Sequence, residues 1–249
     1  MKTEPLKDLV AGLDLQTDLW WLAMILTGFL ATFLAAFGFP GAGSFFVWLA
    51  VLVRLAIVAG VSQQPYGAVF VRLLPLGLVV GCFAIFGDHM LVNFSDRAQR
   101  VYPEHSGVLL SSPLYLPLFW SCLIIEFGYT ILRIYGLIAK HLTGDLPFYG
   151  AMLLGGLIAA LWTACTDFWA VKAKWWSYQT DDSVILGGAC ALYVVIATFF
   201  IFCAFLPVFL GYLSCPGSRL YASVRYGLIY GLVIFVSYIV AHLLVEHKI

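Results

Sequence analysis

The sequence contains little charge. Charged residues make up only 10% of the 249 positions, whereas an ordinary soluble domain has about 25%. Hydrophobic residues make up 63%, and the formal net charge is zero with the few basic residues scattered. This composition excludes an ordinary soluble domain, a nucleic-acid-binding surface and a polybasic lipid-binding tail. It indicates a polytopic membrane protein.

Motifs that commonly carry metal or cofactor chemistry are also missing. The six cysteines lie mostly inside apolar runs and form no CxxC pair, which argues against a disulfide framework or a zinc site. No HxxxH pattern has supporting acids, and Asp181-Asp182 does not extend into the Asp-rich motif that binds diphosphate and magnesium. We therefore expect neither a metal nor a cofactor.

A signal peptide is not indicated at the N-terminus. The first 18 residues carry four acids and two lysines, whereas a signal peptide has a basic start and a small-residue cleavage site. We therefore expect the first apolar segment to remain in the mature protein. The predicted organisation is an extramembrane segment, 1–18, followed by a single transmembrane domain, 19–249.

Long apolar runs are what the sequence has in abundance. About 20 apolar residues span the hydrocarbon layer as a helix. By this rule we count seven segments in an all-α membrane bundle: 19–38, 44–61, 68–91, 113–138, 147–171, 184–212 and 224–245. The spacings Gly77-xxx-Gly81 and Gly227-xxx-Gly231 predict close approach of neighbouring helices. Basic residues are nearly balanced between the two faces, and counting Arg72 favours a cytoplasmic N-terminus. The expected location is a bacterial inner membrane.

The fourth segment carries an ionisable residue, Glu126, near its middle. A carboxyl in hydrocarbon is costly, so it normally faces a bundle interior or a wet cavity and has a partner. Helical spacing places four other side chains on the same face, which is therefore predicted to point inward: Phe119, Cys122, Tyr129 and Arg133. The plain alternative is that Glu126 pairs with an intramembrane arginine, namely Arg54, Arg72 or Arg133.

Alternating the helices places the ends of the third and fifth segments at one membrane face. Asp88, His89 and Asp167 should then share a level, and the hydrophilic loop 95–112 is expected to cap a cavity there. Glu126, about 13 residues into its helix, would lie roughly 20 Å deeper. This predicts a funnel with polar groups at the mouth and one acid at the floor. The alternatives are that Asp88 and His89 form a solvated helix end and that Asp167 pairs with Lys172 or Lys174.

Such a funnel is suited to acid catalysis. A carboxyl in apolar surroundings tends to keep its proton, and it can protonate an alkene or an epoxide while aromatic faces stabilise the resulting cation. The candidate catalytic residues are Glu126, Asp167 and Asp88. The candidate substrate-binding residues are His89, Tyr129, Trp120, Trp162, Trp169 and Trp176. The alternative for Trp175, Trp176 and Tyr178 is an aromatic belt at the membrane interface.

Two stretches resemble known families. The block from Pro113 to Trp120, with Trp162 to Asp167 and the Trp175-Trp176 pair, resembles membrane carotenoid hydratases of the bacterioruberin type. The usual Asp-Pro of that family reads Asp167-Phe168 here. The stretch from Cys122 to Thr130 is similar to the acid-bearing helix of the small seven-helix terpene cyclases of meroterpenoid pathways. In those cyclases an intramembrane Glu and a later Asp are the proposed proton donors, which implies Glu126 and Asp167 here.

The function expected from these observations is that of an integral membrane enzyme. It would act on an isoprenoid, terpenoid or carotenoid by acid-catalysed cyclisation or hydration, as an isomerase or a lyase. The expected partners are a lipophilic substrate and membrane lipids but no nucleic acid, and the oligomeric state stays open. The first rival is a non-catalytic subunit or assembly factor held by acid–arginine pairs. The second is a proton-coupled transporter, against which the lack of an inverted repeat argues.

Overall fold

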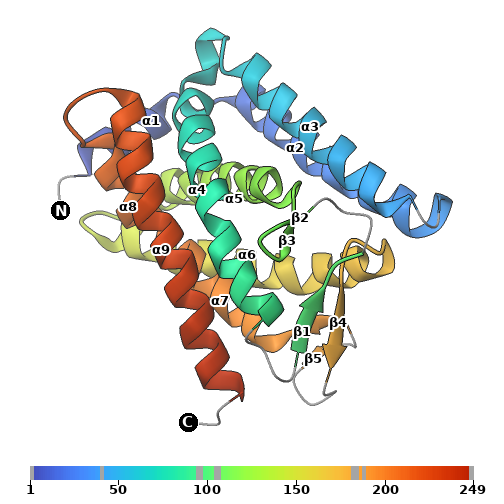
Figure 1. Ribbon diagram of the computed structural model, residues 1–249. Helices are drawn as coiled ribbons and strands as arrows, with labels where there is room; N and C mark the ends of the chain where they lie inside the picture. The colour runs from blue at the N-terminus through green and yellow to red at the C-terminus, as the bar shows by residue number, and fades with distance from the viewer. Residues whose placement is uncertain are drawn as a thin grey trace.

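The computed structural model describes residues 3–39, 42–93, 98–103, 108–180, 185–186 and 189–246. Within these ranges, seven helical segments are long and apolar enough to cross a membrane, so the predicted all-α polytopic bundle is confirmed (Figure 1). After a short helix α1 (Glu4–Ala11), the segments are α2 (Leu15–Phe33) with the π-turn η1 (Leu34–Gly38), α3 (Gly43–Val61), η2 (Pro65–Gly67) with α4 (Ala68–Asn93), α5 (Leu116–Ala139), α6 (Leu146–Lys172), α7 (Leu192–Cys203) with α8 (Phe205–Leu213), and α9 (Arg219–Glu246).

The first, sixth and seventh segments differ from the predicted boundaries, and α9 begins at Arg219 rather than 224. Helix α2 begins at Leu15 because Asp14 and Thr17 form a capping box, in which the Thr17 N–H donates to Asp14 Oδ1 at 2.9 Å. The sixth segment begins at Leu192 rather than 184 and is interrupted at Ala204. Pro207 explains this break, since it has no N–H to donate to the Cys203 carbonyl and its ring crowds that oxygen.

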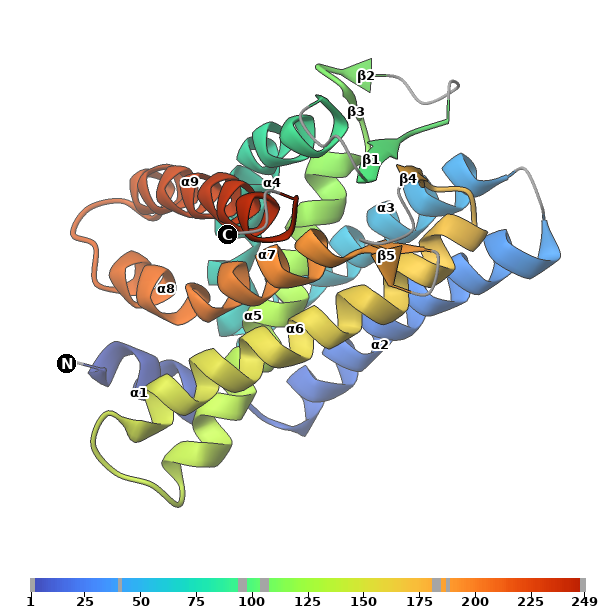
Figure 2. The ribbon, with the colours of Figure 1, turned by 90° about the horizontal axis from the view of Figure 1, so that it is seen from below.

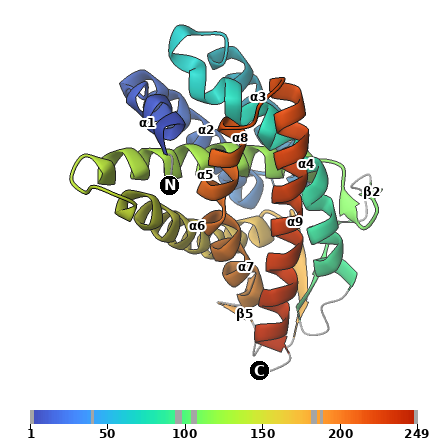
Figure 3. The same cartoon turned by 90° about the vertical axis from the view of Figure 1, so that its left-hand side faces the viewer.

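Helix α5 lies at the centre of the molecule and contacts α1, α2, α3, α4, α6 and α8. Figure 3 shows it crossing α4 and α9 steeply. The face predicted to point inward is buried at Cys122, Glu126 and Tyr129. Ile124 and Ile125, which lie outside the set of side chains predicted to point inward, are equally buried, because neighbouring helices surround α5 on almost every side.

Glycines allow α4 to approach two neighbouring helices. A Cβ on Gly81 would lie 2.0 Å from the Pro117 carbonyl oxygen of α5, so the two backbones are in direct contact. Glycines of α9 pack against the other side of α4, where a Cβ on Gly231 would lie 2.4 Å from Phe83 Cβ. Figure 1 shows α4 and α9 running side by side. The close packing predicted from both glycine spacings is confirmed.

Short strands follow the ends of α4 and α6, and the sequence reading did not predict them. Strand β1 (Ala98–Val101) pairs antiparallel with β4 (Ser177–Thr180), with Arg100 opposite Tyr178. Two small hairpins accompany this ribbon: β2 (Val108–Leu109) with β3 (Ser112–Pro113), and β5 (Ile185–Leu186) with β6 (Cys190–Ala191). The β1–β4 ribbon brings the chain after α4 against the chain after α6.

Candidate functional site

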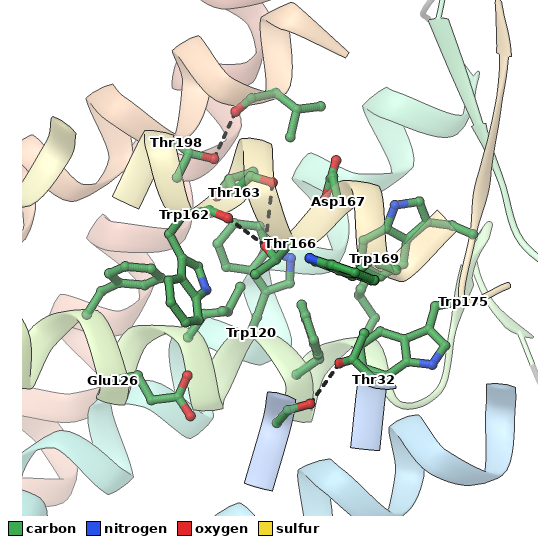
Figure 4. Close-up of a pocket in the computed structure, with 18 of the residues that line it drawn as sticks. Thr32, Trp120, Glu126, Trp162, Thr163, Thr166, Asp167, Trp169, Trp175 and Thr198 are labelled. Carbon is green, nitrogen blue, oxygen red and sulfur yellow. Dashed lines mark hydrogen bonds between the residues drawn. The ribbon is translucent and has the colours of Figure 1, made fainter. Parts of the chain in front are cut away.

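One pocket is lined by both Glu126 and Asp167, the two acids that the sequence indicates most strongly as site residues. Its walls come from α2, α3, α5, α6, α7, α9 and the β1–β4 region, and both Glu126 and Asp167 line it. The space that no atom fills is about 1160 Å³, part of which is open to the surroundings. In Figure 4, Glu126 extends from α5 and Asp167 from α6, and both are drawn among the residues that line the pocket. The structure thus places both residues on one pocket.

Glu126 forms a buried ion pair with Arg54 of α3. The Arg54 Nε–H donates to Glu126 Oε1 at 2.6 Å, and Nη2 donates to Oε2, so the contact is bidentate. The residues are only 5% and 2% exposed, respectively. The guanidinium also packs against α2, where a Cβ on Gly28 would lie in ordinary van der Waals contact with Arg54 Cζ, at 3.5 Å. The ion-pair interpretation of Glu126 is therefore correct in geometry, with Arg54 as the partner.

Arg133 lies on the same helix as Glu126 and was another predicted partner of that acid. In the structure it forms an ion pair with a different residue. It pairs with Asp18 at the start of α2, and Tyr129 Oη also donates to Asp18, at 2.7 Å. Tyr129 stacks on Phe70 with ring centroids 5.3 Å apart. Tyr129, predicted to contact substrate, is not among the pocket-lining residues. It joins α5 to α2 instead.

A second polar cluster surrounds Arg100 of β1 at the capped end of the pocket. Arg100 Nη1 donates to Asp88 Oδ1 at 3.2 Å, and Nη2 donates to Tyr178 Oη at 2.7 Å. Tyr178 Oη in turn donates to Asp167 Oδ2 at 2.7 Å, while Arg100 Nη2 lies 3.8 Å from the same oxygen. The β1–β4 register sets Arg100 and Tyr178 directly opposite each other, which places their side chains on one face.

Asp88 is the acid of this cluster that accepts the most side-chain hydrogen bonds. It accepts hydrogen bonds from Tyr102 Oη at 2.6 Å and Ser112 Oγ at 2.5 Å in addition to Arg100. With only 1% of its surface exposed, it is not a solvated helix end, and that interpretation was wrong. His89 instead lies beside Ser111 Oγ, 3.1 Å from its Nδ1, and is not a pocket-lining residue.

Among the described residues, the cluster contains one permanent positive charge, Arg100, for two carboxyl groups. Burial alone would lower the pKa of Arg100, but the oxygens of Tyr178, Tyr102, Asp167 and Asp88 together raise it well above its ordinary value. The guanidinium is therefore charged. Burial has the opposite effect on the tyrosines. It is the main cause that raises the pKa of Tyr178 and Tyr102 well above that of a free phenol, so both phenols stay neutral. Asp167 pairs within this cluster, so the alternative pairing with Lys172 or Lys174 was wrong.

Aromatic side chains form most of the remaining wall. Four tryptophans predicted to contact substrate all line the pocket: Trp120, Trp162, Trp169 and Trp176. Phe119 packs edge-on against both Trp175 and Trp176, with centroid distances of 6.2 and 6.0 Å. Trp175 and Trp176 are each only 5% exposed. The interpretation of these two as an interfacial belt was therefore wrong.

Helices α2 and α6 flank the pocket on its apolar side. Figure 2 shows the two helices running side by side, and Phe29 of α2 meets Trp162 of α6 edge-on, with centroids 5.4 Å apart. Phe29 and Phe33 line the pocket yet are exposed on the outer surface. These two phenylalanines therefore form a thin wall between the pocket and the apolar exterior of the bundle.

Sequence reasoning missed Arg100, Tyr102 and Ser112 as site residues. All three lie in the hydrophilic connection after α4, which was expected only to cap a cavity. The other charged residues of that connection, Asp96, Arg97, Glu104 and His105, lie outside the described residues. A signal was present in the alternation Arg100-Val-Tyr102, because residues two apart along an extended chain point to the same side. Within the described part of the chain, no group of three or more His, Cys, Asp or Glu side chains is arranged to hold a metal ion.

Comparison with known proteins places part of the chain in a family model. The model is described as a domain of unknown function (DUF6989), and it matches residues 85–245. No curated protein and no solved structure matches the chain. The matched region includes every member of the Arg100 cluster and Glu126, whereas Arg54 and helix α2 lie outside it.

Proposed function

The chain belongs to the DUF6989 family, and we propose that it is an integral membrane enzyme that transfers a proton to a lipophilic isoprenoid, terpenoid or carotenoid. The protonated alkene or epoxide would then cyclise or add water. One observation carries this proposal: an aromatic-walled pocket inside a membrane bundle contains a carboxyl, Asp167, that shares Arg100 with a better-bonded acid.

Charge balance supports Asp167 as the proton donor. Asp88 receives hydrogen bonds from Arg100, Tyr102 and Ser112, and such donors stabilise its ionised form. With Arg100 neutralised by Asp88, a second carboxylate would be a buried charge without its own counterion, which is costly. We therefore assign the proton of the resting state to Asp167. Because Tyr178 donates to Oδ2, the proton belongs on Oδ1.

Glu126 is the weaker donor candidate for the same reason. Its two oxygens both accept from Arg54, so the pair is balanced one to one and Glu126 is the carboxylate. A carboxylate without a proton is not a general acid. In this proposal the Arg54–Glu126 pair forms a fixed floor of the pocket and joins α3 to α5.

The proposed reaction begins when the Asp167 Oδ1–H bond breaks and the proton attaches to an alkene carbon or an epoxide oxygen. The carbocation that forms lies among the faces of Trp120, Trp162 and Trp169, whose negative quadrupole stabilises positive charge. An internal double bond or a water molecule then attacks the cation. Loss of a proton to the Asp167 carboxylate restores the acid, so no net proton is consumed.

Substrate access is proposed to be lateral. The wall formed by Phe29 and Phe33 separates the pocket from the apolar flank of the bundle, and an isoprenoid would partition into the surrounding lipid. Parting of α2 from α6 would admit it without passage through water.

We further propose a bacterial inner membrane with the N-terminus in the cytoplasm. Burial of Arg100 removes one exposed basic residue from the capped face, which favours this orientation.

A specific observation favours one alternative function. The buried Arg54–Glu126 pair is what a non-catalytic membrane subunit would need to hold its helices together. That role explains the pair but leaves the aromatic pocket and the second carboxyl of the Arg100 cluster without a purpose. The enzyme proposal accounts for all three features.

The direct test of the proposed function replaces Asp167 with asparagine. Lipid extracts from cells that make carotenoid and prenylated precursors are compared by liquid chromatography and mass spectrometry, with wild type, Asp167→Asn or an empty vector. The proposal expects a product isomeric with a precursor, or heavier by one water, only with wild type. Loss of a general acid lowers the rate by roughly 10²–10⁴-fold.

Thr166→Val is the matched control, because Thr166 lines the same pocket on the same helix but donates only to backbone carbonyls of its own helix. It should retain most of the product. Identical extracts for all samples, with the proteins folded in the membrane, would contradict an enzymatic function and favour the structural subunit.

A further inference from the structure

Helix α2 is the wall of the pocket that is least buried in the bundle. Only 17% of the residues in its apolar 18-residue stretch are buried, whereas the other six described spans have at least 33%. Three residues of its C-terminal half, Phe29, Thr32 and Phe33, nevertheless line the pocket, and Figure 4 shows Thr32 there. A displacement of this half would therefore open the pocket toward the apolar flank of the bundle.

The N-terminal half of α2 is fixed to α5 by polar contacts. Trp21 Nε1 donates to the Glu126 carbonyl oxygen at 3.2 Å. Asp18 forms an ion pair with Arg133 and accepts a hydrogen bond from Tyr129 Oη at 2.7 Å. Separation of α2 from α5 at this level would break all of these bonds together. This half is therefore expected to stay in place when the other half moves.

The C-terminal half is held in a different way. Among the described residues, no hydrogen bond or ion pair joins residues 28–38 to another helix. The ring contacts of this segment with α6 are edge-on: Phe29 meets Trp162 with centroids 5.4 Å apart, and Phe37 meets Trp169 with centroids 5.5 Å apart. Such contacts are favourable, but their separation leaves no charged group or hydrogen-bond donor without a partner.

The junction between the two halves is a weak point of the helix. Gly28 has the lowest helix propensity of any residue except proline. Beside it, the hydroxyls of Thr27 and Thr32 donate to carbonyls four residues earlier, at 2.8 and 2.7 Å, and such bonds often bend helices. The helix then ends in the π-turn η1, in which the Phe39 N–H donates to the Leu34 carbonyl at 2.9 Å. Segment 28–38 is thus bounded by irregular helix geometry at both ends.

One side chain of α6 contacts the far end of this segment. Lys172 Nζ lies 4.3 Å from the ring centroid of Phe37 and 5.9 Å from that of Trp169. A cation over an aromatic face is attracted by the quadrupole of the ring. Because Lys172 is exposed, this contact is weak enough to break and form again. It joins α6 to the segment at the end farthest from Gly28.

We propose that segment 28–38 is a gate through which a ligand dissolved in lipid enters the pocket, with its hinge at Gly28 and with Lys172 as the latch that holds it closed on α6. Residues 15–27 stay attached to α5 while the gate swings outward. This gate deepens the lateral access described above, because it assigns the moving half of α2, the hinge and the latch. It rests on the proposed function only in taking lipid as the source of the ligand.

Fluorine NMR of the purified protein in detergent tests the gate directly. A genetically encoded 4-trifluoromethylphenylalanine replaces Phe33 in the gate or, in a second sample, Trp20 in the fixed half. Both positions are exposed, at 56% and 38%. We expect a major and a minor resonance from the label at Phe33 and a single resonance from the label at Trp20. Lys172→Met should raise the population of the minor resonance about two- to fivefold, since an exposed cation–π contact contributes about that factor.

Lys174→Met is the matched control. Lys174 is also an exposed lysine at the same end of α6, but in the described part of the chain it lies over no aromatic ring. This substitution should leave both populations unchanged. Phe37→Leu removes the ring that Lys172 contacts most closely. Lys172→Met should then have little further effect in the Phe37→Leu background, because the two residues act as one contact.

Each contrary outcome removes a different part of the proposal. A single resonance from the label at Phe33 that Lys172→Met leaves unchanged would overturn the gate. Equal changes at both labels would show that α2 moves as a whole and would overturn the hinge. The same increase in Lys174→Met as in Lys172→Met would overturn the latch. The chemistry of the pocket is judged separately by the Asp167→Asn extracts, so failure of the gate and failure of the proposed function are distinguishable.

Discussion

Two buried clusters of charge lie on the same pocket, and they differ in their charge balance. At the floor, Arg54 and Glu126 form a bidentate pair of one acid and one base. At the cap, Arg100 faces two acids, Asp88 and Asp167. The floor pair is complete without any proton on its carboxyl. The cap cluster is balanced only when one of its acids is protonated.

This difference separates a structural role from a chemical one. A paired carboxylate holds helices together but has no proton to give, whereas the extra acid of an unbalanced cluster retains one. Glu126 is the more conspicuous residue in the sequence because it lies in the middle of an apolar run. Under the proposed function the acid is instead Asp167 of the cap cluster, which lies beside a cavity lined by aromatic rings.

The largest expected effect is on the stability of the floor pair. Glu126→Gln or Arg54→Met alone leaves a buried charge without its partner, which should cost about 3–5 kcal/mol. The double variant removes both charges and should recover much of that loss, because apolar replacement of a buried ion pair is often close to neutral. Denaturant unfolding in mixed micelles measures all three variants. A double variant destabilised by the sum of the two single effects would show that the two residues do not act as a unit.

Asp88→Asn tests the charge balance of the cap cluster. Without the Asp88 charge, Asp167 becomes the only carboxylate available to Arg100 and should lose its proton. Product formation should then fall by roughly a hundredfold or more, although Asp88 does not line the pocket. The rate is measured on the product identified in lipid extracts.

Ser112→Ala is the control for that experiment. It removes one hydrogen bond to Asp88, from Oγ at 2.5 Å, but keeps the Asp88 charge. Its activity should stay within several-fold of wild type. Full activity in Asp88→Asn would contradict the idea that Asp88 keeps Asp167 protonated.

A smaller effect is expected from the tyrosines, which occur in the cap cluster but not in the floor pair. Burial raises the pKa of Tyr102 and Tyr178 well above 10.0. Their phenols ionise more readily in the unfolded chain, so their contribution to stability is complete below about pH 10 and is lost as pH rises above it. The free energy of unfolding should fall less steeply between pH 10 and 11 in Tyr178→Phe than in wild type. An unchanged slope would show that the Tyr178 phenol titrates normally.

Most of the fold could be read from the sequence because hydrophobicity and glycine spacing are local signals. The seven apolar runs gave the spans, and the Gly77 and Gly227 repeats gave the close packing around α4. The break near Ala204 follows from Pro207, which cannot donate a backbone hydrogen bond within a helix. The strands were missed because segments such as Ala98–Val101 are too short for an alternating pattern to stand out.

The site was only partly predictable for a different reason. Asp167, Glu126 and the tryptophans are unusual residues in apolar helices, so they drew attention. Arg100 looks like an ordinary loop arginine, and only its pairing with Tyr178 across β1 and β4 carries it into the bundle. The choice of Arg54 among three arginines as the partner of Glu126 likewise depends on which helices contact α5. Tertiary contacts decide these pairings.

Infrared spectroscopy of the purified protein at neutral pH tests the central claim most directly, because the carbonyl stretch of a protonated carboxyl is separate from the bands of carboxylates. Wild type and Glu126→Gln should both show a protonated-carboxyl band that is absent from Asp167→Asn and from Asp88→Asn. A band that persists in Asp167→Asn and disappears in Glu126→Gln would contradict the account, since the proton would then lie at the floor of the pocket and not at its cap.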